Sequence, residues 1–295
     1  MLVNKLVFVG ALASMALSIQ TANAAEDCPG IFSGEPCNGG TGIDNCTRVD
    51  DGEVECDLRP ATQGVNAFFV SPSNTDFQGY GFDGAGEEFC CAYDSLDDGC
   101  DVGLITVTIY GTDYNDTLRL VDTTAGENLD CSEATVYGDI GNDEIKGSPS
   151  TDNDDILMGD AGADVIYGYA GDDVIEGGDG PDYIYGGDDD DTIDGGAGID
   201  HLFGNDGNDT IDGGDGADYI KGGADDDVLH GGPDPDNICG GTEDDDLYGD
   251  GDDDIITGET GTDKNDGGVG GIDRCEPDND VNCSNWSTLD SACTW

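Results

Sequence analysis

Residues 177–203 read GGDGPDYIY, GGDDDDTID and GGAGIDHLF, three nonapeptides built on one plan. Each begins with Gly, has Asp at its sixth position and carries Ile or Leu at its eighth. The plan extends over thirteen blocks between Gly159 and Cys275: position one is Gly in all thirteen, position six is Asp in twelve, and position eight is Ile or Leu in the first eleven. A fixed period of this kind predicts a solenoid, in which each repeat stacks on its neighbours.

Each position of the nonapeptide suggests a structural role. Gly supplies positive φ and close backbone approach, so we expect the first six residues to form a tight turn. The last three residues form a short strand, whose alternation sends the position-eight side chain to one side and its neighbours to the other. Two nonapeptides then complete one coil, and residues eighteen apart stack at about one strand spacing, ~4.8 Å.

Looser copies of the repeat precede the regular run. They are GDIGNDEIK at Gly138, a stretched copy at Gly147 that carries Asp155, and a more distant GTDYNDTLR at Gly111. The segment LITVTIYG, from Leu104, alternates as a strand and leads into the most distant copy. We therefore expect the repeats and the region before them to share a continuous sheet.

Stacking places the turn carboxylates of successive coils opposite one another. Two carboxylates about 5 Å apart repel by roughly 3 kcal/mol at an effective dielectric near 20. The buried aliphatic residues alone do not offset the entropy lost on ordering the 117 residues of the thirteen blocks. The sequence therefore predicts that folding is coupled to cation binding. Carboxylate and carbonyl oxygens in an irregular cage suit Ca²⁺ better than Mg²⁺, and Zn²⁺ would require His or Cys.

The tandem GGxGxDxUx pattern resembles the RTX, or haemolysin-type, calcium-binding repeat. The resemblance implies a parallel β-roll with several Ca²⁺ ions held in both rows of turns by the position-six Asp and by turn carbonyls. Carried over residue by residue, it implies these metal ligands: Asp143, Asp155, Asp164, Asp173, Asp182, Asp191, Asp200, Asp209, Asp218, Asp227, Asp236, Asp245, Asp254 and Asp263.

Composition narrows the possible partners. The chain has 68 Asp plus Glu against 8 Lys plus Arg, a formal net charge of -60. This charge argues against nucleic acid, whose binding requires a basic surface, and against anionic membrane surfaces. An acidic, Gly-rich disordered segment would share the composition, but disorder does not require an aliphatic residue every nine positions.

The N-terminus predicts export. Lys5 precedes an apolar run that ends in Ala22-Asn23-Ala24, so residues 1–24 are interpreted as a cleaved signal peptide; the alternative is a membrane anchor. We expect a secreted or extracellular protein, at the cell surface or in the periplasm, with no membrane insertion. Many RTX proteins leave the cell without such a signal, so the expected route here has two steps.

Twelve cysteines in an exported chain favour disulfides over redox or metal chemistry, although their pairing cannot be deduced. The expected fold is all-β: a parallel β-roll with a small disulfide-rich N-terminal β domain and a C-terminal disulfide cap. The predicted divisions are a cysteine-rich domain at 25–104, a transition with degenerate repeats at 105–158, the roll at 159–275 and the cap at 276–295.

Calcium binding without catalysis is the expected function. The two histidines, His201 and His230, lie in strand positions and match no zinc-protease or Ser-His-Asp pattern. Alternation also predicts one aromatic outer face, including Tyr183, Tyr185 and Phe203, and one mostly polar face. Such aromatics either support the sheet or form a contact surface. The alternatives are therefore an adhesive module that binds carbohydrate, ice or itself through this face, and a secreted enzyme with an RTX tail. Surface polysaccharide and a second copy are the macromolecular partners considered.

Overall fold

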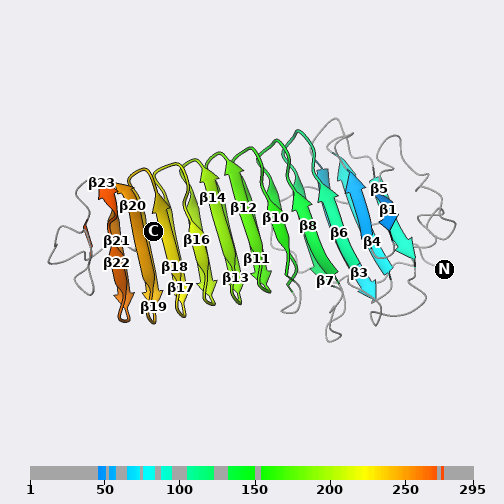
Figure 1. Ribbon diagram of the computed structural model, residues 1–295. Coiled ribbons are helices and arrows are strands. Elements are labelled where there is room, and N and C mark those ends of the chain that lie inside the picture. The colour runs from blue at the N-terminus through cyan, green and yellow to red at the C-terminus, as the bar shows by residue number, and fades with distance from the viewer. Residues whose placement is uncertain are drawn as a thin grey trace, which may run out of the picture.

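A computed structural model shows an elongated solenoid made of two facing sheets (Figure 1). Within the described part of the chain, no helix is long and apolar enough to span a membrane. The structure describes the backbone of residues 46–50, 53–57, 65–73, 76–83, 88–94, 105–122, 132–149, 154–270 and 274–275, and the side chains of 108–120, 134–149, 154–269 and 275.

Even-numbered strands of the repeat region form sheet A, with the strand order β1-β2-β6-β8-β10-β12-β14-β16-β18-β20-β22; β23 pairs with β20. From β2 onward its strands pair in parallel. Their bounds are β1 Cys46–Asp50, β2 Glu53–Asp57, β6 Ile105–Tyr110, β8 Ser132–Tyr137, β10 Ile156–Met158, β12 Val174–Asp179, β14 Thr192–Ala197, β16 Thr210–Asp212, β18 Val228–Gly232, β20 Asp246–Asp252, β22 Lys264–Asp266 and β23 Val269–Gly270.

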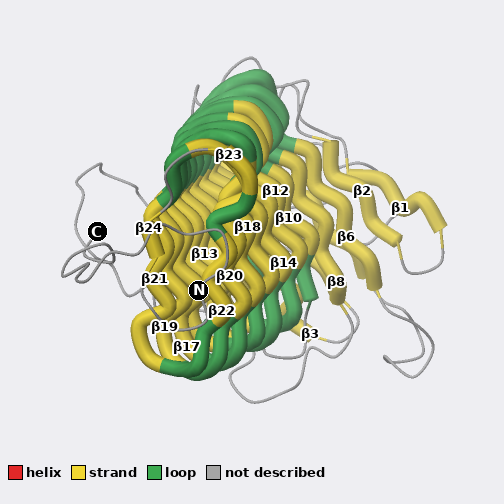
Figure 2. The backbone as a smooth tube through the Cα atoms, turned by 60° about the vertical axis from the view of Figure 1, so that its left-hand side comes forward, coloured by secondary structure: helices red, strands yellow, loops and turns green. Residues whose placement is uncertain are grey.

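Odd-numbered strands of the repeat region form sheet B, with the order β24-β21-β19-β17-β15-β13-β11-β9-β7-β3-β4-β5. The chain crosses from one sheet to the other at every turn, so the two rows of turns run along opposite edges of the solenoid (Figure 2). The bounds are β3 Val65–Ser73, β4 Asp76–Asp83, β5 Glu88–Asp94, β7 Thr117–Asp122, β9 Glu144–Lys146, β11 Val165–Ala170, β13 Tyr183–Asp188, β15 His201–Asp206, β17 Tyr219–Ala224, β19 Asn237–Thr242, β21 Ile255–Thr260 and β24 Arg274–Cys275.

The register confirms that two nonapeptides complete one coil. Ile166 lies opposite Ile184, which lies opposite Leu202, in steps of eighteen residues. The position-eight side chains of both sheets point inward and form the core, with exposed fractions of 0–1%. This core consists of Ile166, Ile175, Ile184, Ile193, Leu202, Ile211, Ile220, Leu229, Ile238, Leu247 and Ile256, and Ile145 and Leu157 extend it toward the N-terminus.

Glycine has two roles, which fall at different positions of the repeat. Positive φ falls at positions two and four, as at Gly178 and Gly180, and not at the invariant position one. At position one the requirement is space: a Cβ on Gly177 would lie 2.6 Å from an Asp182 carboxylate oxygen and 2.6 Å from the carbonyl oxygen of Gly195. The structure thus shows both positive φ and close backbone approach in the turns, as expected.

The first five strands extend the two sheets of the roll. Strand β2 pairs in parallel with β6, and β3 pairs in parallel with β7, whereas β1-β2 and β3-β4-β5 are antiparallel. The expected sheet continuity is confirmed. The domain boundaries and the cysteine pairing stay predictions; Cys239 and Cys275 are buried and disulfide-bonded. The predicted signal peptide at 1–24 and the cap at 276–295 lie outside the described residues.

Candidate metal centre

Each row of turns carries a ladder of buried aspartates, one from position six of each repeat as far as Asp263. Turns that lead into sheet A are called A-row turns here, and those that lead into sheet B are called B-row turns. All these aspartates are at most 3% exposed. The A-row ladder is Asp155, Asp173, Asp191, Asp209, Asp227, Asp245 and Asp263, and the B-row ladder is Asp116, Asp143, Asp164, Asp182, Asp200, Asp218, Asp236 and Asp254.

Backbone hydrogen bonds hold each carboxylate in its ladder. The N–H of Asp164 donates to Oδ1 of Asp182 at 2.7 Å, and the N–H of Asp182 donates to Oδ1 of Asp200 at 2.8 Å. Equivalent bonds of 2.7–3.1 Å link the aspartates of each row from Asp143 and Asp155 onward. One oxygen of each acceptor carboxylate is thus fixed by the preceding coil.

The second carboxylate oxygen of these aspartates, Oδ2, indicates what the ladder can bind. Burying such an oxygen without a partner is costly, because no water replaces the lost hydrogen bonds. Hard, anionic oxygens are the ligands Ca²⁺ prefers, so the donor set fits this ion. No three or more acidic, His or Cys side chains converge within the described residues, so turn carbonyls would have to complete any cage. Oδ2 has no hydrogen-bond partner in Asp143, Asp164, Asp173, Asp182, Asp191, Asp200, Asp209, Asp218, Asp227, Asp236 and Asp245.

Burial shifts the acid-base behaviour of these carboxylates. Desolvation, together with neighbouring carboxylates, raises the pKa of Asp173 to about 9 and that of Asp191 to about 8. In Asp182, where desolvation alone opposes a backbone hydrogen bond, the pKa is raised to about 6. The most strongly shifted aspartates, such as Asp173 and Asp191, therefore retain their protons at neutral pH unless a cation compensates their charge.

Comparison with protein families agrees with this arrangement. A model of the RTX calcium-binding nonapeptide repeat (4 copies) matches residues 149–184, 170–202, 203–238, 230–264 and 240–271. Residues 149–271 are RTX repeats. These RTX repeats form a parallel β-solenoid whose stacked Asp ladders are consistent with Ca²⁺ binding. No curated protein sequence matches the chain at a significant level.

The structure places all fourteen predicted RTX ligands in the two ladders, and their role as ligands stays a prediction. Asp155 differs from the others, because its Oδ2 accepts the N–H of Ser148 at 2.6 Å. The ladder also contains Asp116, which the prediction omitted although it is position six of GTDYNDTLR. Its Oδ2 accepts the N–H of Thr112 at 2.6 Å. Local hydrogen bonds thus replace an open oxygen at the first aspartate of each row.

Substitutions in the middle and at the end of the RTX run should differ in effect. Asp200→Ala removes the carboxylate that accepts the N–H of Asp182, in the middle of the ladder, where coils stack on both sides. Asp263 belongs to the last coil, where Asn265 occupies the aliphatic position. We expect Asp200→Ala to lower calcium affinity and the free energy of unfolding more than Asp263→Ala, by roughly 2 kcal/mol against 1 kcal/mol. Calcium titration and urea unfolding measure both; equal effects would contradict a stacked array.

The raised pKa values predict opposite pH dependences with and without calcium. A carboxylate whose folded-state pKa exceeds its unfolded value binds protons more tightly when folded, so the stability it contributes is complete below about pH 4 and lost as pH rises through the folded-state pKa. For Asp182 and Asp173 this loss extends from about 6 to about 9. The calcium-free fold should weaken from pH 5 to pH 8, while calcium affinity increases because fewer protons compete. Thermal melts in chelator and calorimetry at both pH values test this; a calcium-free fold that strengthens with pH would refute it.

Proposed function

We propose that this protein is a calcium-binding β-roll that folds as Ca²⁺ enters both rows of turns, and that it acts outside the cytoplasm without catalysing a reaction. The observation that carries the proposal is the series of eleven buried carboxylate oxygens without partners. When bound, the ion supplies the positive charge that these oxygens lack. The protein's own part is to hold one oxygen of each carboxylate on the backbone and to exclude water from the ladder.

Direct titration tests calcium binding. Calorimetry or equilibrium dialysis of the whole chain at pH 7.5 should show several Ca²⁺ ions per molecule at millimolar or lower concentration. Mg²⁺ is the control, because its small octahedral shell dehydrates reluctantly and suits an irregular cage poorly. Absence of binding at millimolar Ca²⁺ would overturn the proposed function. For export, sequencing of the mature protein is expected to begin at Ala25, and a retained 1–24 segment would support the anchor interpretation.

The outer face of sheet B supports a second candidate function. Tyr167, Tyr185 and Phe203 stack in one column with centroid distances of 5.0 and 4.9 Å. In the parallel column His201 lies between Tyr183 and Tyr219, at 4.5 and 4.7 Å. The rings are within 8° of parallel in each pair, so their faces are covered by one another and mainly edges and hydroxyls meet solvent. This stacking supports the sheet and leaves an ordered row of polar ring edges.

The outer face of sheet B carries fewer acidic side chains than the outer face of sheet A. Lys146 and Lys221 stand at the two ends of the Tyr167 column, in register with it. Between β9 and β21, the only acidic residue at positions seven and nine is Glu144, which is paired with Lys146. The equivalent positions of sheet A between β10 and β22 carry Glu176, Asp194, Asp212, Asp246 and Asp266.

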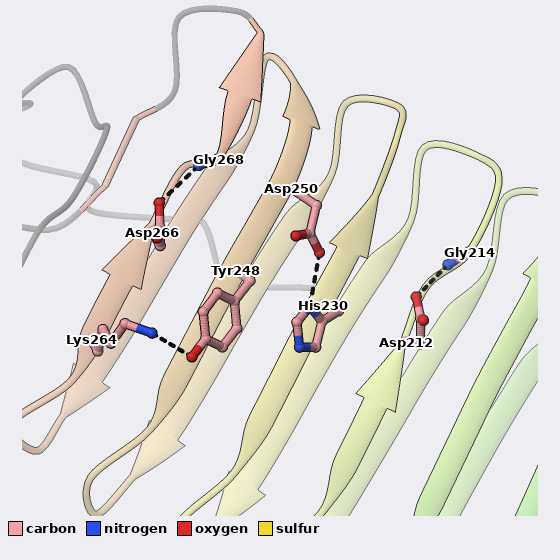
Figure 3. Close-up of polar contacts among 8 residues, drawn as sticks. All are labelled: Asp212, Gly214, His230, Tyr248, Asp250, Lys264, Asp266 and Gly268. Carbon is pink, nitrogen blue, oxygen red and sulfur yellow. Dashed lines mark hydrogen bonds and ion pairs between the residues drawn. The ribbon is translucent and has the colours of Figure 1, made fainter.

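On sheet A, the basic side chains interact with neighbouring residues of the same sheet. Figure 3 shows His230 paired with Asp250, at 2.8 Å, and Lys264 hydrogen-bonded to Tyr248. Lys264 also lies 3.8 Å from the centre of the Tyr248 ring, a cation–π contact. Among the side chains that the structure describes on sheet A, the basic groups His230 and Lys264 are therefore both engaged with neighbouring residues.

A neutral polysaccharide is the partner that fits the outer face of sheet B best. The face is a strip about 10 Å wide and about 30 Å long, from strand dimensions. Its area of about 300 Å² is well below the ~800 Å² per partner of a stable protein interface, which favours a linear polymer over a second copy. Tyrosine hydroxyls match the hydroxyls of such a chain, whereas the net charge of -60 disfavours a polyanion.

The aromatic side chains can be tested by a triple substitution. Replacing Tyr183, Tyr185 and Phe203 by Ser should preserve the calcium-loaded circular dichroism spectrum and weaken binding to a neutral glycan at least about tenfold. The matched control replaces Thr192, Thr210 and Val228 of sheet A by Ser. Unchanged glycan binding, loss of the fold, or binding to acidic glycans or to a second copy alone would each reject this candidate.

A further inference from the structure

A second ladder lies outside the first and runs along the A-row from Asp154 onward. In the B-row the same kind of bond joins only Asn115, Asn142 and Ala163, at 3.1 and 3.2 Å, among the described residues. At position five, Oδ1 of Asp172 accepts the N–H of Asp190 at 3.1 Å, and Oδ1 of Asp190 accepts the N–H of Asn208 at 2.8 Å. Similar bonds of 2.8–3.2 Å run from Asp154 to Thr262, through Asp172, Asp190, Asn208, Asp226 and Asp244.

The two ladders of the A-row reach in opposite directions along the roll. In the inner ladder a carboxylate accepts from the coil before it, as Asp209 accepts from Asp191 at 2.9 Å. In the outer ladder a side chain accepts from the coil after it, as Asp190 accepts from Asn208. Each A-row turn is thereby joined to both neighbouring turns by two side chains that are adjacent in sequence.

The B-row turns from Ala163 to Pro235 lack the side-chain acceptors that form the outer ladder. Their position-five residues have side chains that cannot accept a hydrogen bond, and two of them are prolines, which have no N–H to donate. The N–H of Ala163 still donates to Oδ1 of Asn142 at 3.2 Å, but from Pro181 to Pro235 the B-row turns keep only the inner ladder. The position-five residues concerned are Ala163, Pro181, Ile199, Ala217 and Pro235.

The rows also differ in charge. The four central A-row turns carry eight acidic residues besides position six, whereas the four central B-row turns carry three. More nearby carboxylates and a pre-ordered turn both favour tighter binding of a divalent cation. The A-row residues are Asp188, Asp189, Asp190, Asp206, Asp225, Asp226, Glu243 and Asp244, and the B-row residues are Asp179, Asp215 and Asp234.

We propose that the two rows of turns form two classes of calcium site, and that the outer Asp ladder makes the A-row the tighter class. The proposal rests on the proposed function, since it presupposes calcium in both rows. The outer residues act as positioning residues: they order the turn backbone and add negative charge beside the inner ladder. The expected difference in affinity between the rows is on the order of tenfold.

Amide exchange on the full chain can resolve the two rows. NMR measures protection of the position-six N–H groups of both rows as free Ca²⁺ is raised from chelated levels. Asp191, Asp209 and Asp227 report on the A-row, and Asp182, Asp200 and Asp218 report on the B-row. We expect the A-row amides to reach half-protection at about one tenth of the calcium required by the B-row.

Asparagine substitutions separate charge from hydrogen bonding, because Asn208 already occupies the outer ladder with its Oδ1 accepting at 3.2 Å. Changing Asp172, Asp190, Asp226 and Asp244 to Asn should move the A-row midpoint at least about threefold toward that of the B-row, and the same four changed to Ala should move it further. The control removes the same number of charges from the outer face of sheet A: Glu176→Gln, Asp194→Asn, Asp212→Asn and Asp246→Asn.

A reciprocal variant builds the missing ladder in the other row. Pro181→Asp with Ile199→Asp places two acceptors eighteen residues apart, opposite the N–H groups of residues 199 and 217, and should lower the B-row midpoint. Equal midpoints in the wild type, or the same shift in the four-charge control as in the ladder variant, would overturn the two-class inference while leaving calcium binding intact. Absence of calcium-dependent protection in both rows would instead overturn the proposed function itself.

Discussion

Excess chelator at pH 8 is expected to remove most of the far-ultraviolet β signal, and millimolar Ca²⁺ is expected to restore it in one cooperative step. Without the ion, the carboxylates of each row would be buried one strand spacing apart with an oxygen lacking a partner, which costs several kcal/mol per pair of coils. The narrow core, with one inward side chain per nonapeptide, does not offset that cost. Cooperativity is expected because each coil contacts only its neighbours and needs them to fold.

Circular dichroism with a calcium titration makes this measurement, and the design requires two controls. Mg²⁺ at equal concentration should not restore the signal, and KCl at matched ionic strength separates site binding from general charge screening. A spectrum unchanged by chelation would show that the roll folds without metal. In that case the unpartnered oxygens of Asp182 and its equivalents must be neutralised by protons alone.

Gly180→Ala is expected to lower the free energy of unfolding by at least about 3 kcal/mol in saturating calcium. Gly180 has φ +133°, a conformation that L side chains rarely adopt, and a Cβ at this position would overlap the carbonyl oxygen of Gly162 in the preceding coil. The overlap involves backbone on both sides, so neither coil can yield without disturbing its turn.

Gly251→Ala is the matched control for this substitution. Gly251 occupies position three of its repeat, where Ala197 and Ala224 stand naturally. A Cβ there would lie 3.3 Å from the carbonyl oxygen of Pro233, and φ is not positive. We expect a change below about 1 kcal/mol. Urea unfolding monitored by circular dichroism compares the two, and similar losses for both would mean that the turn backbone adjusts more freely than the stacking suggests.

The period alone predicted the roll, the inward position-eight residues and the buried position-six aspartates. Stacking of Ile166, Ile184 and Leu202 follows directly from a nine-residue repeat that needs two strands per coil. The separation of aromatic and polar outer faces could be predicted for the same reason, because strand alternation acts identically in every repeat. These features depend on local geometry that recurs without change.

Features that depend on contacts between coils could not be predicted in this way. The conformation at position two is set by the turn rather than by residue preference, so Tyr169 and Glu259 adopt φ of 85° and 70° where Gly is usual. The outer ladder was missed because position five varies in identity, and only the structure shows that Asp190 and Asn208 accept the same backbone bond. Pairing of β2 with β6 could not be foreseen, since the region before residue 105 has no period.

The alternation of successive nonapeptides between two unlike sheets limits how the gene can change in length. A duplication or loss of one nonapeptide would transfer every downstream strand to the opposite sheet. The column that contains Tyr185 and Phe203 would then be continued by acidic residues such as Asp212, and the outer ladder would switch edges partway along the roll. Only changes of eighteen residues preserve both faces and both rows. The inherited unit of this protein is therefore the pair of repeats.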